Sequence, residues 1–298
     1  MLSIQSEYSG HTGSIFAMKA DTAEDFLYTA GDDKVVAKWH LAQENYAEAL
    51  LQTPSSIYAM TLLEAENILA IGTRDGTFYL VNTFSKEVKA THRPFTEPVY
   101  ALNYDAEMGR LWVLYGGGNL CILELKTGEI SHILPLANTH LRSLIFEKEQ
   151  AFVGASDGNI YILDKNSLSP LRKIQAHDNS VFCLSFFAQN KWLLSGGRDA
   201  HLNVWDMKNE MKAIEKIPAH NYTINDIAFS PENEYFATAS RDKTLKIWDA
   251  DSLALLKVGD YARYKSHTHS INRLVWLQKS NILISCGDDR RIIRWKIG

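Results

Sequence analysis

Histidine, a hydroxyl residue and aspartate recur at a fixed spacing in four parts of this 298-residue chain. In the stretch from Ala219 to Asp249 they are His220, Thr238 and Asp242. A hydroxyl nucleophile, an imidazole base and a carboxylate that orients the imidazole are the three groups of a hydrolytic triad. These residue types could therefore perform acyl transfer, if the fold brought them together beside an accessible substrate.

The spacing of the four sets favours a structural network over catalysis. Each set ends on a tryptophan that stands 28 residues after the histidine, ten after the hydroxyl and six after the aspartate. An enzyme seldom needs four equivalent triads on one chain. A relay from indole N–H to hydroxyl, to imidazole and to carboxylate would instead satisfy buried polar groups within a sheet. The four predicted structural relays are His11, Thr29, Asp33 and Trp39; His177, Ser195, Asp199 and Trp205; His220, Thr238, Asp242 and Trp248; and His267, Ser285, Asp289 and Trp295.

Three weaker copies of the same unit fill the gap between the first and second relays. They carry an aliphatic residue in place of the tryptophan, and apolar residues stand where the relay hydroxyl would be. The chain therefore contains seven units, and their ends are 40 to 47 residues apart. The units end near Trp39, Val81, Leu123, Leu163, Trp205, Trp248 and Trp295. A fixed period of this length is typical of a repeat architecture.

The elements that position these residues are predicted to be strands. Short β-branched and aromatic runs with a period of two are separated by turns such as Asp-Gly, Asp-Lys and Ser-Pro, which indicates about four strands in each unit. No stretch predicts a long helix. The Gly116-Gly117-Gly118 run lacks the Lys-Ser/Thr pair of a phosphate loop and is interpreted as a permissive turn.

The repeated motif resembles the WD-repeat β-propeller family, whose units are about 40–45 residues long with four strands per blade. The Trp-Asp pair stands at Trp205-Asp206 and Trp248-Asp249, whereas Trp39 and Trp295 are followed by His40 and Lys296, and His11 alone among the relay histidines follows a glycine. The resemblance implies an all-β fold: a single seven-bladed β-propeller over residues 1–298, with four-stranded antiparallel blades.

The two ends of the chain predict how such a ring closes. The last unit stops just after its third strand, and the segment from Leu2 to Tyr8 reads as an extra strand before the first unit. An open ring would leave an exposed strand edge, which is a liability for aggregation. We therefore expect residues 2–8 to complete blade seven as its outer strand.

Charge and composition exclude several classes of function. The chain has 31 basic and 35 acidic side chains, without a basic face to neutralise phosphates, so nucleic-acid binding is not expected. No apolar run approaches the roughly 18 residues of a membrane helix, and the N-terminus lacks a signal pattern. The three cysteines, Cys121, Cys183 and Cys286, are too far apart for a disulfide framework or a zinc site. A cytoplasmic protein without cofactor or metal is expected.

The resemblance also implies where a partner would bind, namely on the face around the central channel. Two aligned positions are expected to lie there. The first comprises Phe16, Tyr58, Tyr100, Arg142, Phe182, Asn225 and Asn272, and the second comprises Asp32, Arg74, Gly116, Ser156, Arg198, Arg241 and Asp288. Aromatic residues and arginine are the types that dominate interface hot spots. The alternative interpretation is that the aromatic residues only pack the inner strands.

These observations predict a non-enzymatic protein–protein interaction scaffold. Its partner would be a protein or peptide with acidic or aromatic residues, bound at the ten aromatic, arginine and asparagine positions named above. One alternative is a hydrolase-like propeller enzyme with carboxylates at the channel mouth, for which Asp32 and Asp288 are the candidates. Another is an obligate subunit of a larger assembly.

Overall fold

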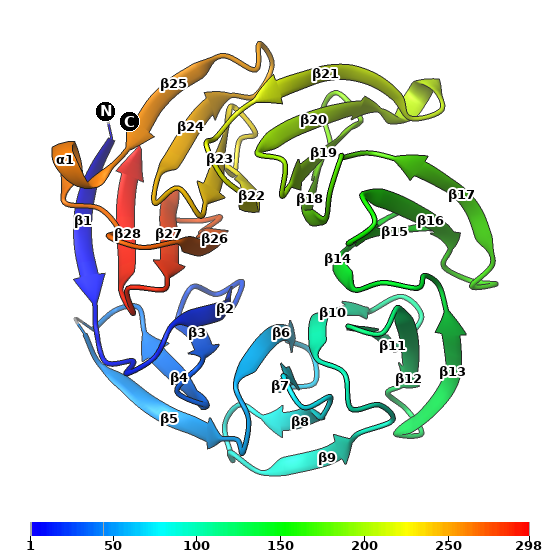
Figure 1. The fold of residues 1–298 in the computed structure, drawn as a ribbon. Coiled ribbons are helices and arrows are strands. Elements are labelled where there is room, and N and C mark those ends of the chain that lie inside the picture. Colours follow the sequence, from blue (N-terminus) through cyan, green and yellow to red (C-terminus); the bar gives the residue numbers. More distant parts are fainter. Residues whose placement is uncertain (1, 44, 298) are drawn as a thin grey trace.

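Seven four-stranded sheets surround a central channel in the computed structural model, which describes residues 2–43 and 45–297 (Figure 1). Helix is confined to one 3₁₀ turn, η1 (Met207–Asn209), and one short α-helix, α1 (Tyr261–Tyr264), within the described residues. Adjacent strands are antiparallel throughout every sheet. The predicted fold class, a seven-bladed all-β propeller, is confirmed. Met1, Glu44 and Gly298, which the predicted domain includes, lie outside the described residues.

Each blade begins with an inner strand at the channel and ends with an outer strand at the rim. Blades 1 to 3 contain β2 (Ile15–Ala20), β3 (Phe26–Gly31), β4 (Val35–His40) and β5 (Ala47–Gln52); β6 (Ile57–Leu63), β7 (Ile68–Thr73), β8 (Phe78–Asn82) and β9 (Val88–His92); and β10 (Val99–Asp105), β11 (Arg110–Tyr115), β12 (Asn119–Glu124) and β13 (Glu129–Pro135). Blades 4 and 5 contain β14 (Leu141–Glu147), β15 (Gln150–Ala155), β16 (Asn159–Asp164) and β17 (Pro170–Gln175); and β18 (Val181–Phe187), β19 (Trp192–Gly197), β20 (His201–Asp206) and β21 (Lys212–Pro218). Blades 6 and 7 contain β22 (Ile224–Phe229), β23 (Tyr235–Ser240), β24 (Leu245–Asp249) and β25 (Leu255–Gly259); and β26 (Ile271–Trp276), β27 (Ile282–Gly287), β28 (Ile292–Ile297) and β1 (Leu2–Tyr8).

The hydrophobic core forms a circle between the blades. The middle strands are buried along most of their length, as in β11 and β23, whereas outer strands such as β17 and β21 are largely exposed. The buried hydrophobic residues of the described chain fall into seven clusters, and each cluster lies between two neighbouring blades. No blade can therefore bury its own apolar surface alone, which is the physical reason for the repeat.

Strand β1 closes the ring as the outer strand of blade 7, next to β28 (Figure 1). Leu2 is 4% exposed and packs with Trp295 in the cluster between blades 6 and 7. Tyr8 is 1% exposed and stacks on Trp39 of blade 1 at 5.5 Å between ring centroids. Arg291 of blade 7 donates two hydrogen bonds to the Glu7 carboxylate, both at 2.6 Å. The N-terminal strand thus binds blade 7 to both of its neighbours.

The turn between the second and third strands has the same backbone conformation in every blade. Its third residue has a positive φ, between 65° and 87°, in all seven blades. Blades 2, 3 and 4 use glycine there, and Gly118 has no room for a Cβ because the Ala137 carbonyl oxygen would be 1.9 Å away. Blades 1, 5, 6 and 7 instead have Lys34, Ala200, Lys243 and Arg290. In these four blades, as in blades 2 and 4, the preceding aspartate accepts a backbone hydrogen bond across the turn, which fixes its conformation.

Candidate functional site

The four predicted sets of histidine, hydroxyl, aspartate and tryptophan come together in blades 1, 5, 6 and 7. The tryptophan indole donates to the hydroxyl at 2.7–3.0 Å. The histidine Nε2 lies 2.7–2.9 Å from the same hydroxyl. The histidine Nδ1 lies 2.7–2.9 Å from an aspartate oxygen. Because a carboxylate only accepts hydrogen bonds, Nδ1 carries the proton, and in a neutral imidazole Nε2 then accepts from the hydroxyl.

Burial determines what these groups can do chemically. The four hydroxyl residues, Thr29, Ser195, Thr238 and Ser285, are 0% exposed, so no substrate can reach their oxygens. Burial alone would raise the pKa of each relay aspartate, but hydrogen bonds from histidine and from backbone amides outweigh it and lower the pKa, to about 2 for Asp199. Burial lowers the pKa of His220, although Asp242 opposes this shift. A neutral imidazole beside a carboxylate fits a fixed hydrogen-bond network.

The networks hold two loops together at one end of each of these blades. The residue after the histidine donates its backbone N–H to the same aspartate at 2.9–3.2 Å. The histidine stands five residues before the first aligned face position, and the aspartate directly follows the second. In all seven blades the second position donates its backbone N–H to the carbonyl two residues before the first, at 2.8–3.0 Å. The two sets of face positions therefore lie side by side on one face of the ring.

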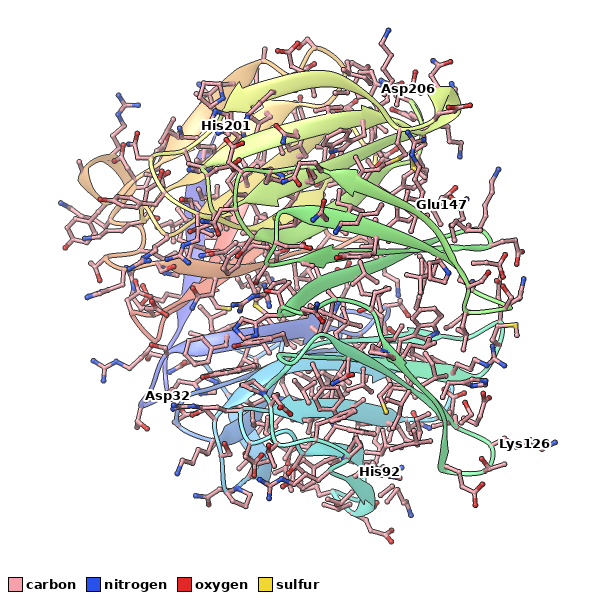
Figure 2. All side chains as sticks on the ribbon, turned by 45° about the vertical axis from the view of Figure 1, so that its right-hand side comes forward. Asp32, His92, Lys126, Glu147, His201 and Asp206 are labelled. Atoms are coloured by element: carbon pink, nitrogen blue, oxygen red, sulfur yellow. The ribbon has the colours of Figure 1, made fainter. Side chains whose placement is uncertain are left out.

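Figure 2 views the ring obliquely, so that its two faces lie toward opposite sides of the picture. Asp32 and His201 lie toward one face, whereas Glu147, Lys126 and Asp206 lie toward the other. This agrees with the topology, because Asp32 belongs to the turn between β3 and β4, and Asp206 ends β20 at its far end. We call the face that carries Asp32 the upper face.

A β-bulge occurs at the same place in the inner strand of every blade. The pairing of the first two strands skips one residue, for example between Ile15 and Ala17 and between Val99 and Ala101. The skipped residue is the first aligned face position in all seven blades. A bulged residue has no partner across the ladder, and its side chain is turned out of the regular alternation. The bulges place these seven side chains at the channel mouth, where they line a cavity of about 350 Å³.

Aromatic rings and Arg142 form a continuous arc along this mouth from blade 1 to blade 5. Phe16 meets Tyr58 edge-on at 5.4 Å, and Tyr58 stacks on Tyr100 at 5.8 Å with 3° between their planes. The Arg142 guanidinium lies 4.1 Å from the Tyr100 ring centroid and 5.1 Å from that of Phe182. All five side chains are nevertheless partly exposed. The rings pack against each other and leave part of their surface exposed at the mouth.

The two asparagines of the mouth connect neighbouring blades. The Asn225 amide donates to the Ile271 carbonyl of blade 7 at 2.8 Å, and the Asn272 amide donates to the Ile15 carbonyl of blade 1 at 2.9 Å. Asn272 also donates to Asp288 at 2.7 Å. Much of their hydrogen-bonding capacity is thus used within the ring.

The second aligned positions differ in charge around the mouth. Arg74, Arg198 and Arg241, on blades 2, 5 and 6, are exposed. Asp32 accepts a hydrogen bond from the Ser56 hydroxyl at 2.7 Å, and with Asp288 it lines a cavity of about 380 Å³ between blades 7 and 1. In blades 3 and 4 the second aligned position is uncharged, namely Gly116 and Ser156. The Ser156 hydroxyl accepts a hydrogen bond from Arg142 Nε at 2.9 Å.

The carboxylates of blades 7 and 1 are not assembled into a triad. His269 lines the same cavity as Asp32 and Asp288, but its Nδ1 lies 3.0 Å from the Thr268 hydroxyl. Among residues 2–43 and 45–297, no three His, Cys, Asp or Glu side chains are grouped to hold a metal ion. No helix within these ranges is long and apolar enough to cross a membrane.

The structure adds two residues to the upper face and mouth that the repeat alignment did not select. Tyr222, in the loop after His220, is 61% exposed. Arg273 follows the bulged residue of blade 7 and lines the mouth cavity with the seven aligned side chains. An aromatic residue in the loop between the relay histidine and the inner strand was the available signal for Tyr222. Arg273 stands at a position that is small in five other blades, which was the signal for it.

The closed ring of repeated four-stranded blades defines this protein as a seven-bladed β-propeller. The family model "WD domain, G-beta repeat" matches residues 2–40, 168–206, 211–249 and 260–296, together more than half of the chain. The chain belongs to this WD-repeat family. The four matches contain the four relays, and each begins at or near the outer strand of the preceding blade, which places β1 in the same match as blade 1.

Several curated proteins are similar to parts of the chain. The human WD repeat and FYVE domain-containing protein 1 is 24% identical over 68% of this chain and 52% of its own length. Autophagy-related protein 16 of Arabidopsis thaliana is 22% identical over 66% of this chain and 39% of its length. The Target of rapamycin complex subunit wat1 of Schizosaccharomyces pombe is 28% identical over 28% of both chains. The chain thus spans about half or less of these relatives.

Proposed function

We propose that this propeller is a non-enzymatic scaffold that binds a protein or peptide on the upper face around its channel. The observation that carries the proposal is the arc of partly exposed aromatic rings with Arg142 among them, displayed by bulges at the mouth of a cavity. Propellers of this family generally serve as scaffolds, and two of the relatives named above are a WD-repeat protein and a complex subunit by name.

The chemistry of the face indicates the partner. Tyr58 and Tyr100 offer ring surface, and the exposed arginines of blades 2, 5 and 6 offer guanidinium groups beside them. Aromatic side chains and carboxylates complement such a surface, because arginine binds carboxylates through paired hydrogen bonds and stacks on rings. The partner we propose is therefore a segment with acidic or aromatic residues. The ten proposed contact residues are Phe16, Tyr58, Arg74, Tyr100, Arg142, Phe182, Arg198, Asn225, Arg241 and Asn272.

The test combines Tyr58→Ala with Arg198→Glu. We expect partners captured by affinity purification, and identified by mass spectrometry with wild-type protein, to be lost with this double variant. Each hot-spot residue contributes about 2 kcal/mol, so loss of both should weaken binding by about 1,000-fold. Circular dichroism checks that the fold is retained.

A matched control is available on the opposite face of the ring, which we call the lower face. Phe84 is 65% exposed in the turn between β8 and β9, and Lys126 is exposed in the turn between β12 and β13 (Figure 2). Phe84→Ala with Lys126→Glu likewise removes one aromatic ring and reverses one positive charge, and should leave partner capture unchanged. Equal capture by wild type and by the upper-face variant would refute the proposed face.

A second candidate function is a permanent subunit of a larger assembly. It is favoured by the relative whose name describes a subunit of the Target of rapamycin complex. It predicts that the chain expressed alone is insoluble or misfolded, whereas a scaffold with exchangeable partners is soluble and monomeric.

We also propose a cytoplasmic location, where the three buried, free cysteines of the chain stay reduced.

A further inference from the structure

A second cavity, of about 280 Å³, lies in the channel below the mouth. Tyr100, Arg142, Phe182 and Arg273 line both cavities, which makes the two continuous. The residue directly after the bulge lines this deeper cavity in every blade. In blades 1 to 5 it is small, namely Ala17, Ala59, Ala101, Ser143 and Cys183. Small residues leave space at the axis of the ring.

Blades 6, 7 and 1 interrupt this small lining with charges. Asp226 and Arg273 occupy the position after the bulge in blades 6 and 7, and Lys19 reaches the cavity from blade 1, two residues further along its strand. With Arg142 the wall contains three basic side chains and one carboxylate. The lining therefore has an excess of two positive charges.

The carboxylate does not neutralise the neighbouring cations through hydrogen bonds. Asp226 Oδ1 accepts from the Ile227 amide at 3.0 Å, and Oδ2 accepts from the Leu274 amide at 2.9 Å. Arg273 uses Nη1 on backbone carbonyls of Asn225 and Asn272, at 3.3 and 3.4 Å. Its Nε and Nη2 have no hydrogen-bond partner within the described chain, and neither has Lys19 Nζ.

Lys19 carries its charge in a desolvated part of the channel, beside Asp226 and Arg273. Its side chain is accessible from the channel, but the surrounding wall desolvates it, and this lowers its pKa; Asp226 raises the pKa and Arg273 lowers it further. Desolvation also raises the pKa of Asp226, in spite of Arg273 and Lys19. Because the channel desolvates both Lys19 and Asp226, an anion beside Lys19 and Arg273 would stabilise the wall.

We propose that the channel wall formed by Lys19, Arg273 and Asp226 is a binding site for an oxyanion, a carboxylate or a phosphate. Lys19 Nζ and the unused nitrogens of Arg273 donate charge-assisted hydrogen bonds to its oxygens. Asp226 holds the inner strands of blades 6 and 7 in register and limits the net charge of the site. Lys19 and Asp226 lie deeper in the channel than the aromatic arc, and the proposal does not rest on the proposed function of the upper face.

The experiment titrates two probes, inorganic phosphate and glutarate, at constant ionic strength, with isothermal titration calorimetry and thermal denaturation. Saturable binding to wild-type protein is expected, with a rise in melting temperature. Lys19→Met keeps the length of the side chain and removes its charge, and should weaken binding about tenfold or more. Lys257→Met, on exposed outer strand β25, changes the net charge equally and should bind as wild type.

A variant that is expected to tighten anion binding separates ligand binding from a purely structural effect. Asp226→Asn removes the negative charge from the wall and should tighten binding of both probes, even where it lowers stability. Preference for phosphate would assign the site to a free phosphate-type anion, and preference for glutarate to an acidic side chain of a partner. Absence of saturable binding to wild type, or equal binding by wild type and Lys19→Met, would overturn the proposal. Tyr58→Ala with Arg198→Glu should still bind both probes, because it changes only the upper face.

Discussion

The substitution Asp199→Ala tests the physical basis of the blades that carry a relay. Asp199 accepts hydrogen bonds from His177 Nδ1 at 2.9 Å, from the Asp178 amide at 3.2 Å and from the His201 amide at 3.2 Å. The His177 side chain is 0% exposed and would lose the acceptor of its ring N–H. Leaving one buried donor unsatisfied costs about 1–3 kcal/mol. The amides next to the surface can turn to water and add less.

The pKa of Asp199 supports an estimate of the same size. Its usual value of 3.8 falls to about 2 in the folded protein. One pKa unit corresponds to about 1.4 kcal/mol, so the ionised carboxylate stabilises the fold by about 2 kcal/mol, an upper value because solvent near the surface screens the interaction. We therefore expect the free energy of unfolding to fall by about 2 kcal/mol at pH 7, which is a decrease of about 3 °C in melting temperature for a chain of this length.

The pH dependence has a definite sign. Because the folded pKa is the lower one, this stabilisation is fully present above the unfolded value of 3.8 and is lost as the pH falls toward 2. The difference between wild type and Asp199→Ala should shrink over that window. Thermal denaturation followed by circular dichroism at several pH values measures it.

A matched control stands at the same place in blade 4, where no relay exists. Asp157 is 30% exposed, accepts from Tyr161 at 2.8 Å and from the Asn159 amide at 3.1 Å, and has no histidine partner in the described chain. Asp157→Ala should therefore cost less than about 1 kcal/mol. Equal melting temperatures for wild type and Asp199→Ala, or an equal loss in both variants, would refute the structural interpretation of the relay.

Two further predictions concern closure and burial. Deletion of residues 2–8 removes the outer strand of blade 7, with buried Leu2 and Tyr8, and exposes the edge of β28; light scattering and thermal denaturation should show aggregation and a lower melting temperature, and unchanged values would contradict closure by β1. Burial raises the pKa of the Cys121 thiol to about 12 and also raises that of Cys183 and Cys286. A thiol reagent at neutral pH should therefore label no cysteine of the native protein and all three after denaturation, and rapid labelling of the native protein would contradict the buried placement.

The fold could be predicted because its constraints act at fixed offsets along the chain. Each relay must satisfy buried polar groups of His177, Ser195 and their counterparts, so the residue types recur at constant spacing. A ring of seven four-stranded blades, which the structure confirms, needs an outer strand in blade 7. Because the last unit supplies only three strands, its edge would be exposed, and this was enough to predict that residues 2–8 cover it. The grouping of residues 1–298 into one domain and the ten proposed contact residues remain predictions.

The details of the channel could not be predicted, for two physical reasons. No particular residue type marks a bulge in the sequence. Phe16, Arg142 and Asn225 share a backbone geometry but no side-chain chemistry. The charged wall combines Lys19 of blade 1 with residues of blades 6 and 7, and only closure of the ring brings them together. The hydrogen bond from Asn272 to the Ile15 carbonyl likewise crosses the closure.

The bulges allow side chains at the channel mouth to be exchanged without changing the rest of the ring. The bulged side chain has no cross-strand partner, and exchanging it disturbs neither the ladder nor the clusters between blades. In blades 1 to 5 the side chain is held mainly by its neighbours along the mouth, whereas Asn225 and Asn272 also bind the next blade. Five of the seven bulges are therefore places where the surface of the channel mouth can change one residue at a time while the blades stay the same. If this mouth binds the proposed partner, related rings can differ in what they bind at little cost in stability.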